Sequence, residues 1–202
     1  MSSNILSRPV PVRNFAVLFF GAQKNLGTTG VTVAVVRKSL LPQPSPALMR
    51  RLGLPVPPAV LSYETTAKNK SLYNTLSIFD VYVAGRVLKK LLETYPDKVR
   101  GQEAVSNKKA AILYAALDAH PEVYKVVPDK SVRSRMNLCF RVIKNGNVDE
   151  AEKTFLKEAT SRGLTGLKGH RSVGGIRASN YNSIPLEGAE KLARFLEDFA
   201  KA

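Results

Sequence analysis

Two apolar runs separated by a short glycine-bounded loop constrain this chain more than any other feature of its sequence. Residues 16–20 form an apolar run that ends at Gly21, and residues 31–36 form a second run rich in β-branched side chains. Both patterns are typical of buried strands. The loop is too short for a parallel crossover, which needs about a dozen residues. We therefore expect the strands to pair antiparallel, or to occupy separate sheet positions with reversed direction.

Lys24 lies in this loop, three residues after Gly21, and Gly27 and Gly30 follow it. A lysine held near apolar surroundings carries its charge less readily than one in water. Its neutral amine can then attack an aldehyde and form a Schiff base. The pattern alone also fits a solvated loop lysine, so both interpretations stay open on these residues.

The composition narrows the classes of protein to which the chain can belong. Its 202 residues suffice for one large or two small domains. The single cysteine, Cys139, excludes an internal disulfide framework, and we expect its thiol to be buried. The sequence shows neither a signal-peptide pattern nor an apolar run of transmembrane length. We expect a soluble cytoplasmic protein without a membrane partner.

The chain is strongly basic, with 31 Lys and Arg residues against 16 Asp and Glu residues and a net charge of +15. Such an excess attracts polyanions, nucleic acids among them. The basic residues are scattered, however, and neither zinc-ligand spacing nor the aromatic pattern of RNA-binding domains accompanies them. We favour a basic enzyme surface over a nucleic-acid-binding module, and we predict no metal site.

The rest of the chain alternates helical and strand patterns. Residues 1–14 are polar and turn-like, and the proline-rich residues 42–58 are interpreted as a surface loop. Apolar spacing predicts helices over 78–95, 102–118, 148–162 and from 185 onward. Alternation predicts a strand over 137–142, with short strands flanking 169–175. These elements predict an α/β fold with helices on one face of two or three strands.

A second group of candidate residues surrounds a glycine-rich stretch near the C-terminus. His170 and Arg171 follow Gly169, and Arg177 lies six residues beyond Arg171. Arginine binds phosphate and carboxylate through two parallel charge-assisted hydrogen bonds. The pattern suits a substrate with two anionic groups. A basic loop with one arginine in a structural ion pair is the alternative that the residues leave open.

Several short motifs, in order along nearly the whole chain, carry a resemblance to one enzyme family. They are Ser2–Pro9, Gly21–Asn25, Tyr73–Thr75, Ser134–Asn137, Lys168–Arg171, Gly174–Ser179, Asn182 and Pro185–Gly188. On these motifs the chain resembles phosphoserine aminotransferases, which are pyridoxal-phosphate-dependent enzymes of fold type I and class V. The resemblance implies the C-terminal half of that fold. Residues 1–60 would be a remnant of the large cofactor-binding domain, and residues 61–202 a small C-terminal α/β domain.

The resemblance also implies how the cofactor would be held. Lys24 would bind pyridoxal 5′-phosphate through a Schiff base, with Gln23 beside the cofactor. Asn74 and Thr75 would reach the cofactor phosphate, characteristically in the neighbouring subunit of a homodimer. Amide and hydroxyl groups are chemically suited to phosphate oxygens, although by themselves these two residues would be ordinary turn residues.

The implied reaction is the conversion of phosphoserine and 2-oxoglutarate into 3-phosphohydroxypyruvate and glutamate, a step of serine biosynthesis. His170 and Arg171 match the pair that meets the substrate phosphate in the family, and Arg177 matches the arginine that holds the α-carboxylate. The released amine of Lys24 would then move the proton of the substrate α-carbon. The chain would thus act as a transaminase, a transferase, on these small molecules.

The sequence departs from the family pattern in two respects. Family members are nearly twice as long, and the aspartate that pairs with the cofactor's ring nitrogen stands immediately before the residue that matches Met1. Thr28 occupies a position where many members have proline. We therefore expect a truncated or internally started copy with little activity by itself. The alternatives are an inactive remnant that binds a full-length subunit and, less favoured, a basic nucleic-acid-binding module.

Overall fold

The chain forms two compact units in the computed structural model, which describes residues 2–171 and 173–202. The N-terminal unit comprises Met1–Ile5 and Val10–Lys90, and the C-terminal unit comprises Leu6–Pro9 and Leu91–Ala202. The division falls inside helix α3 (Ile78–Thr94), later in the chain than the domain boundary expected after residue 60. The assignment of 1–60 and 61–202 to two family domains stays a prediction.

Two antiparallel strands form the sheet of the N-terminal unit, as the loop length predicted. Strand β1 (Val17–Gly21) pairs with β2 (Thr32–Val36), and Val17 lies opposite Val36. Short helices lie before and after this pair along the chain. Three are 3-10 helices at Val12–Asn14, Lys38–Leu40 and Ala59–Leu61, and two are α-helices, α1 (Pro46–Arg51) and α2 (Tyr63–Lys68).

Helix α1 corrects the interpretation of residues 42–58 as an irregular loop. Ser45 caps this helix, because its hydroxyl accepts the backbone N–H of Leu48 at 3.2 Å, and Pro46 occupies the first turn. Ser62 caps α2 in the same way through the N–H of Thr65. The proline-rich residues 42–58 therefore include the start of a helix as well as surface loops.

One face of the two-stranded sheet is packed and the other is open. Leu18 and Phe20 are buried, whereas Phe19 between them is 65% exposed. Phe19 borders a groove of about 570 Å³ that Val60, Leu61 and other side chains also line. Within the described residues one layer of chain packs against these strands, so the apolar side chain of Phe19 stays exposed on the other face.

Helix α3 forms where apolar spacing predicted it, but a different face of it is buried. Ile78 and Tyr82, whose helical spacing is part of the apolar pattern that predicted the helix, are 72% and 62% exposed. Ala84 is the buried residue of the helix, and it lies beside Gly27 of the lysine loop. The lysine loop therefore rests on α3 through small residues.

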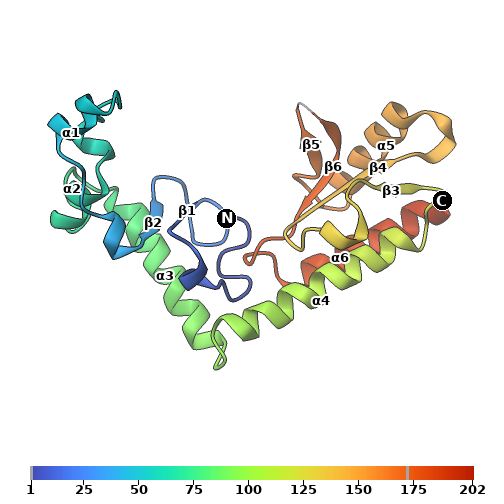
Figure 1. Ribbon diagram of the computed structural model, residues 1–202. Coiled ribbons are helices and arrows are strands. Elements are labelled where there is room, and N and C mark those ends of the chain that lie inside the picture. Colours follow the sequence, from blue (N-terminus) through green and yellow to red (C-terminus); the bar gives the residue numbers. More distant parts are fainter. Residues whose placement is uncertain (1, 172) are drawn as a thin grey trace. The chain divides into compact units, whose positions relative to one another are not determined.

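Four antiparallel strands and three long helices form the C-terminal unit (Figure 1). The strand order is β3-β4-β6-β5, and the bounds are β3 Tyr124–Val126, β4 Asn137–Val142, β5 Lys168–His170 and β6 Gly174–Ser179. The helices are α4 Val99–Asp118, α5 Val148–Ser161 and α6 Leu186–Lys201, and 3-10 turns lie at Lys130–Val132 and Lys144–Gly146. The sequence did not predict β3, whose three residues are too few for a clear alternation.

Phe155 on α5 lies at the centre of the core of this unit and is fully buried. Its ring centroid is 5.8 Å from that of Phe140, 5.0 Å from that of Phe195 and 5.2 Å from that of Phe199. Tyr124 completes the cluster at 6.3 Å. Edge-to-face pairs of this kind stabilise a core beyond the area that they bury.

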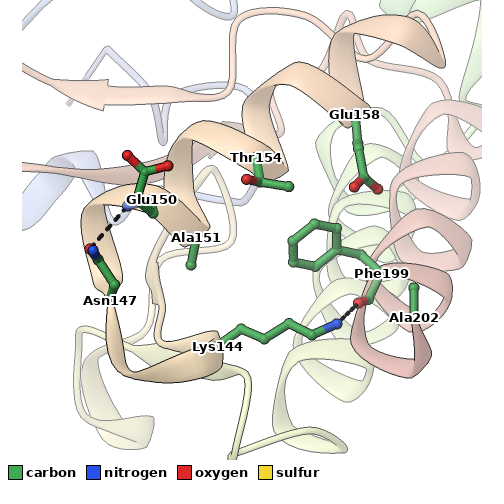
Figure 2. A pocket seen from close by; sticks show the side chains of 8 residues that line it. All are labelled: Lys144, Asn147, Glu150, Ala151, Thr154, Glu158, Phe199 and Ala202. Atoms are coloured by element: carbon green, nitrogen blue, oxygen red, sulfur yellow. Dashed lines mark hydrogen bonds between the residues drawn. The ribbon is translucent and has the colours of Figure 1, made fainter.

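The ends of two helices are fastened next to each other at a pocket of about 290 Å³ (Figure 2). Asn147 caps α5 by accepting the N–H of Glu150 at 3.2 Å. Lys144 donates to the backbone carbonyl of Phe199 at 2.9 Å, in the last turn of α6. A cation at this end of a helix also interacts favourably with the helix dipole. These contacts fix α6 against the start of α5.

A buried lysine on α4 ties this helix to the segment before α6. Lys109 has no exposed surface, and its Nζ donates to the carbonyls of Tyr181 at 2.8 Å and Ile184 at 2.7 Å. Burial lowers the pKa of Lys109 to about 8, because the charged form is poorly solvated there. The neutral amine still has two N–H groups for the two carbonyls.

Stability of the C-terminal unit is expected to rise with pH between about 8 and 9.5 because of Lys109. The folded-state pKa lies below the unfolded value, so the unfolded chain binds more protons in this window and each pH unit favours folding by up to about 1.4 kcal/mol. Urea unfolding of wild type and Lys109→Met at several pH values measures the difference. We expect the Lys109→Met curve to lack this slope; equal slopes would contradict the account. Above about pH 10 tyrosine titration intervenes.

Candidate active site

The lysine loop is a closed turn whose flanking residues are buried. The N–H of Ala22 donates to Val31 at 2.9 Å, and the N–H of Gly27 donates back to Ala22 at 2.7 Å. Ala22 is 1% exposed and Asn25 is 3% exposed, whereas Lys24 between them is only half-buried. The backbone bonds and the buried residues therefore hold the turn in place, and Lys24 lies on its solvent-accessible side.

Asn25 fastens this turn to the start of the chain. Its side-chain amide donates to the carbonyls of Ser3 and Ile5, each at 2.9 Å. The N–H of Gly21 donates to the hydroxyl of Ser2 at 2.9 Å, at the end of β1. Because a buried polar group costs free energy without such partners, these bonds explain why the sequence has asparagine directly after Lys24.

Side chains approach two glycines of the loop closely. A Cβ at Gly21 would lie 2.1 Å from the Oε1 atom of Gln23, so the Gln23 side chain occupies the space over the strand end. Gly30 has a φ of +95°, and a Cβ there would lie 2.2 Å from a carboxylate oxygen of Asp80. The glycine positions thus admit Gln23 and Asp80 rather than simply adding flexibility.

Asp80, at the start of α3, binds the lysine loop at Thr28. Its carboxylate accepts hydrogen bonds from the hydroxyls of Ser77 and Thr28. These two bonds, that from Ser77 first, lower the pKa of Asp80 because they stabilise its charged form. Thr28, which departs from the family pattern, therefore has a structural partner in this chain.

Asn74 and Thr75 lie in the segment before α3, and both side chains are exposed. The Nδ2 atom of Asn74 is 3.5 Å from the carbonyl of Thr75, which is the limit of a hydrogen bond. Both side chains are thus accessible to groups outside this unit. They share the N-terminal unit with Gln23 and Lys24.

His170 and Arg171 lie at the turn between β5 and β6 in the C-terminal unit, and both are exposed. They line a hollow of about 440 Å³ together with Gly174 and residues of α5. Gly174 has a φ of +71° and Gly175 a φ of +74°, which other residues rarely adopt. The structure therefore brings the predicted histidine–arginine pair to one hollow.

Arg177 lies on β6, directly opposite Cys139 on β4. Its neighbours Ile176 and Ala178 point into the core, so Arg177 lies on the other face of the sheet with Cys139. Its Nε atom is buried without a hydrogen-bond partner among the described residues. Such a donor suits a bound carboxylate. Cys139 is half-exposed, which corrects the expectation of a buried thiol.

A protein-family model, Aminotransferase class-V, matches residues 1–192. The chain belongs to the class V aminotransferase family. It is 43% identical to the phosphoserine aminotransferase of Saccharomyces cerevisiae and 44% identical to that of Geobacillus kaustophilus, in each case over 100% of this chain. It covers 50% and 52% of those two proteins, so the chain spans about half the length of the curated relatives it matches.

The α/β fold of this class V aminotransferase chain matches solved structures of the same family. A phosphoserine aminotransferase from Bacillus circulans subsp. alkalophilus superimposes with a TM-score of 0.88 at 42% identity, over 100% of this chain and 52% of that one. A structure of Trichomonas vaginalis phosphoserine aminotransferase with bound pyridoxal phosphate gives a TM-score of 0.85 at 34% identity, over 98% of this chain and 52% of that one. The expected fold class is confirmed.

The residues of the lysine loop fit the aldehyde end of pyridoxal phosphate in chemical type. Lys24 supplies an amine on the accessible side of a fixed turn, and the Gln23 side chain lies over Gly21 at the end of β1. Asn74 and Thr75 offer an amide and a hydroxyl that can donate to phosphate oxygens. Among the described residues no cluster of three or more His, Cys, Asp or Glu side chains could hold a metal ion.

Three residues that contact these candidate sites, Asp80, Arg141 and Glu152, were not predicted from the sequence. Asp80 binds the lysine loop across more than fifty positions, and Arg141 pairs with Glu152 next to the His170–Arg171 turn. Alternation did place Arg141 on the outward face of its strand. Nothing in the sequence indicates which distant side chain a given polar residue contacts.

Within the described chain, no helix is long and apolar enough to cross a bilayer.

Proposed function

We propose that this chain is the portion of a phosphoserine transaminase that carries its cofactor-anchoring lysine and its substrate-binding arginines. The reaction is phosphoserine plus 2-oxoglutarate giving 3-phosphohydroxypyruvate plus glutamate. The observation that carries the proposal is the turn at Lys24, fastened by Asn25 and presenting the amine. The phosphoserine aminotransferases among its relatives support the choice of substrate.

Lys24 would hold the cofactor covalently, and its Nζ atom would move the proton of the substrate α-carbon. Pyridoxal 5′-phosphate, when bound, supplies the electron sink for this proton transfer. Gln23 orients the cofactor from the strand end. The amine needs a fixed position for this task, because proton transfer requires hydrogen-bond reach between donor and acceptor.

His170 and Arg171 bind the phosphate of phosphoserine, and Arg177 binds its α-carboxylate. Charge-assisted hydrogen bonds from guanidinium groups are directional, so two arginines fix both ends of a small dianionic substrate. The buried Nε atom of Arg177 without a partner supports its assignment to the carboxylate. Glutamate and 2-oxoglutarate carry two carboxylates and can use the same groups in the second half of the reaction.

Asn74 and Thr75 bind the cofactor phosphate of a second copy in a homodimer. Their exposure in the segment before α3 supports a role outside their own unit. A chain without turnover of its own could supply these two residues to a full-length subunit, and this is the second candidate function. Co-purification with such a subunit, without a new visible absorbance band on this chain, would distinguish this second function from the first.

We place the reaction in the cytoplasm.

Phosphoserine is expected to bind this chain through Arg171, which can be tested without turnover. Replacing Arg171 by methionine removes the bidentate donor, and a charged hydrogen bond of this kind contributes about 1.5–3 kcal/mol, or at least a tenfold change in Kd. Titration calorimetry with phosphoserine measures this loss. Serine, which has no phosphate, is the matched ligand and its affinity should not change. Equal phosphoserine affinities of wild type and Arg171→Met would refute the assignment.

Turnover by the purified chain is expected to be negligible even with pyridoxal phosphate present. The chain spans about half the length of relatives named for this activity. Groups that the family places elsewhere, among them the carboxylate beside the ring nitrogen, would not be available to the cofactor. Glutamate formation from phosphoserine measures this directly. Full turnover by this chain alone would contradict the expectation while supporting the identity of the reaction.

A further inference from the structure

Arg141 connects α5 to the turn that carries His170 and Arg171. It lies on the outward face of β4, and its Nε atom donates to Glu152 of α5 at 2.6 Å. The Glu152 side chain is 12% exposed and that of Arg141 is 34% exposed. A partly buried pair at this distance is held more firmly than two solvated side chains.

The stem of Arg141 lies in the space that two glycines leave open. A Cβ at Gly175 would lie 3.0 Å from the Cδ atom of Arg141, and a Cβ at Gly174 would lie 3.8 Å from its Nη1 atom. A side chain at Gly175 would therefore crowd Arg141, whereas one at Gly174 would only touch it. The left-handed backbone of both glycines, with φ of +74° and +71°, further restricts them to glycine.

Backbone pairs join the two strands of the β5–β6 hairpin. It is joined through the pairs Lys168 with Ile176 and His170 with Gly174, and the N–H of Val173 donates to His170 at 2.9 Å. Glycine has more conformational freedom than any other residue. Arg141, which lies against Gly175, therefore restricts a strand start that two consecutive glycines leave free to vary.

The same helix forms the opposite wall of the hollow. Asp149, Glu152 and Lys153 of α5 line it together with His170 and Arg171. Glu152 thus belongs to the hollow and also binds the arginine that supports the glycines. One ion pair therefore joins the α5 wall of the hollow to the strand that lies opposite Gly175.

We infer that Arg141, held by Glu152, is a positioning residue for the His170–Arg171 turn, through which it sets the affinity for the substrate phosphate. This inference rests on the proposed function for the identity of the ligand. The mechanical part, in which Arg141 restrains Gly174 and Gly175, does not depend on any ligand. The two parts are separately measurable.

Backbone hydrogen exchange tests the mechanical part on the full chain. Arg141→Met removes the guanidinium and keeps an aliphatic stem, and Glu152→Gln removes only the charge of the partner. We expect the amides of Val173, Gly174 and Gly175 to exchange about tenfold faster in Arg141→Met, because local opening of the hairpin becomes easier. Arg141→Lys should recover part of the protection.

Arg133→Met is the matched control. Arg133 forms a comparable pair with Asp118 in the same unit, at 2.6 Å and 2.8 Å, and neither residue lines the hollow. Its loss should leave exchange at Val173–Gly175 unchanged. Unaltered exchange in Arg141→Met, or equal acceleration in Arg133→Met, would overturn the inference.

Titration with inorganic phosphate, followed by NMR, tests the ligand part. Wild type should bind phosphate about three- to tenfold more tightly than Arg141→Met, with Glu152→Gln between them. If Arg171→Met leaves phosphate binding unchanged, the proposed function fails at this site, and the exchange result still decides the role of Arg141. If Arg171→Met loses binding but Arg141→Met retains wild-type affinity, the inference fails and the proposed function stands.

Discussion

Saturable binding of pyridoxal phosphate, read from the visible absorbance, is expected for the wild-type chain and is expected to be lost in Lys24→Ala. The amine is the group that reacts with the cofactor aldehyde, and alanine has none. The change should leave the turn intact, because Ala22, Asn25 and the backbone bond from Gly27 hold it without the lysine side chain. Titration of both proteins with the cofactor under identical conditions measures the effect.

Lys38→Ala is the control for nonspecific reaction of lysines with the aldehyde. Lys38 is exposed and lies in the same unit, just after β2. Its replacement should leave the titration unchanged, because surface amines react with the aldehyde weakly and without saturation at low concentration. Equal loss of absorbance in both variants would mean that the observed reaction belongs to the surface lysines rather than to the turn.

Phe155→Ala is expected to destabilise the C-terminal unit by about 3–5 kcal/mol, the range for a fully buried phenylalanine. Its ring is unexposed and lies between 5.0 Å and 5.8 Å from those of Phe140, Phe195 and Phe199. These neighbours come from a strand and a second helix, so the cavity cannot close by one local shift. The midpoint of urea unfolding, monitored in this unit, gives the loss of free energy.

Val132→Ala provides the exposed counterpart in the same unit. Val132 is 71% exposed, and surface substitutions of this kind change stability by about 0.5 kcal/mol or less. A small effect at both positions would show that the aromatic cluster around Phe155 is not the centre of the core. A large effect at Phe155 alone confirms the packing described here.

Local patterns predicted most of the elements because they act over a few residues. The antiparallel β1–β2 pair followed from a loop that is too short for a crossover, and α5 followed from apolar spacing that ends at Gly163. The three residues of β3 and the capped helix α1 were missed because the first is too short to alternate and the second lies among prolines. A serine cap and a proline in the first turn favour the start of a helix there, even though the surrounding proline-rich residues have low helix propensity.

From the sequence, only the residues that belong to the family motifs could be assigned to the candidate site. The resemblance supplied the roles of Lys24, His170 and Arg177, whereas the residues that hold them in place came from the structure. Asp80 reaches the lysine loop and Arg141 reaches the glycine hairpin from distant positions. Such contacts depend on which strands and helices lie next to one another in the fold, and the local alternation of side chains does not specify these neighbours.

Borohydride reduction of the chain saturated with pyridoxal phosphate, followed by peptide mapping, tests the central claim most directly. Reduction makes the attachment permanent, so the modified lysine can be read from the mass of its peptide. The account predicts one dominant modification, at Lys24. A modification spread over the exposed lysines, or concentrated at another lysine with Lys24 unmodified, would contradict it.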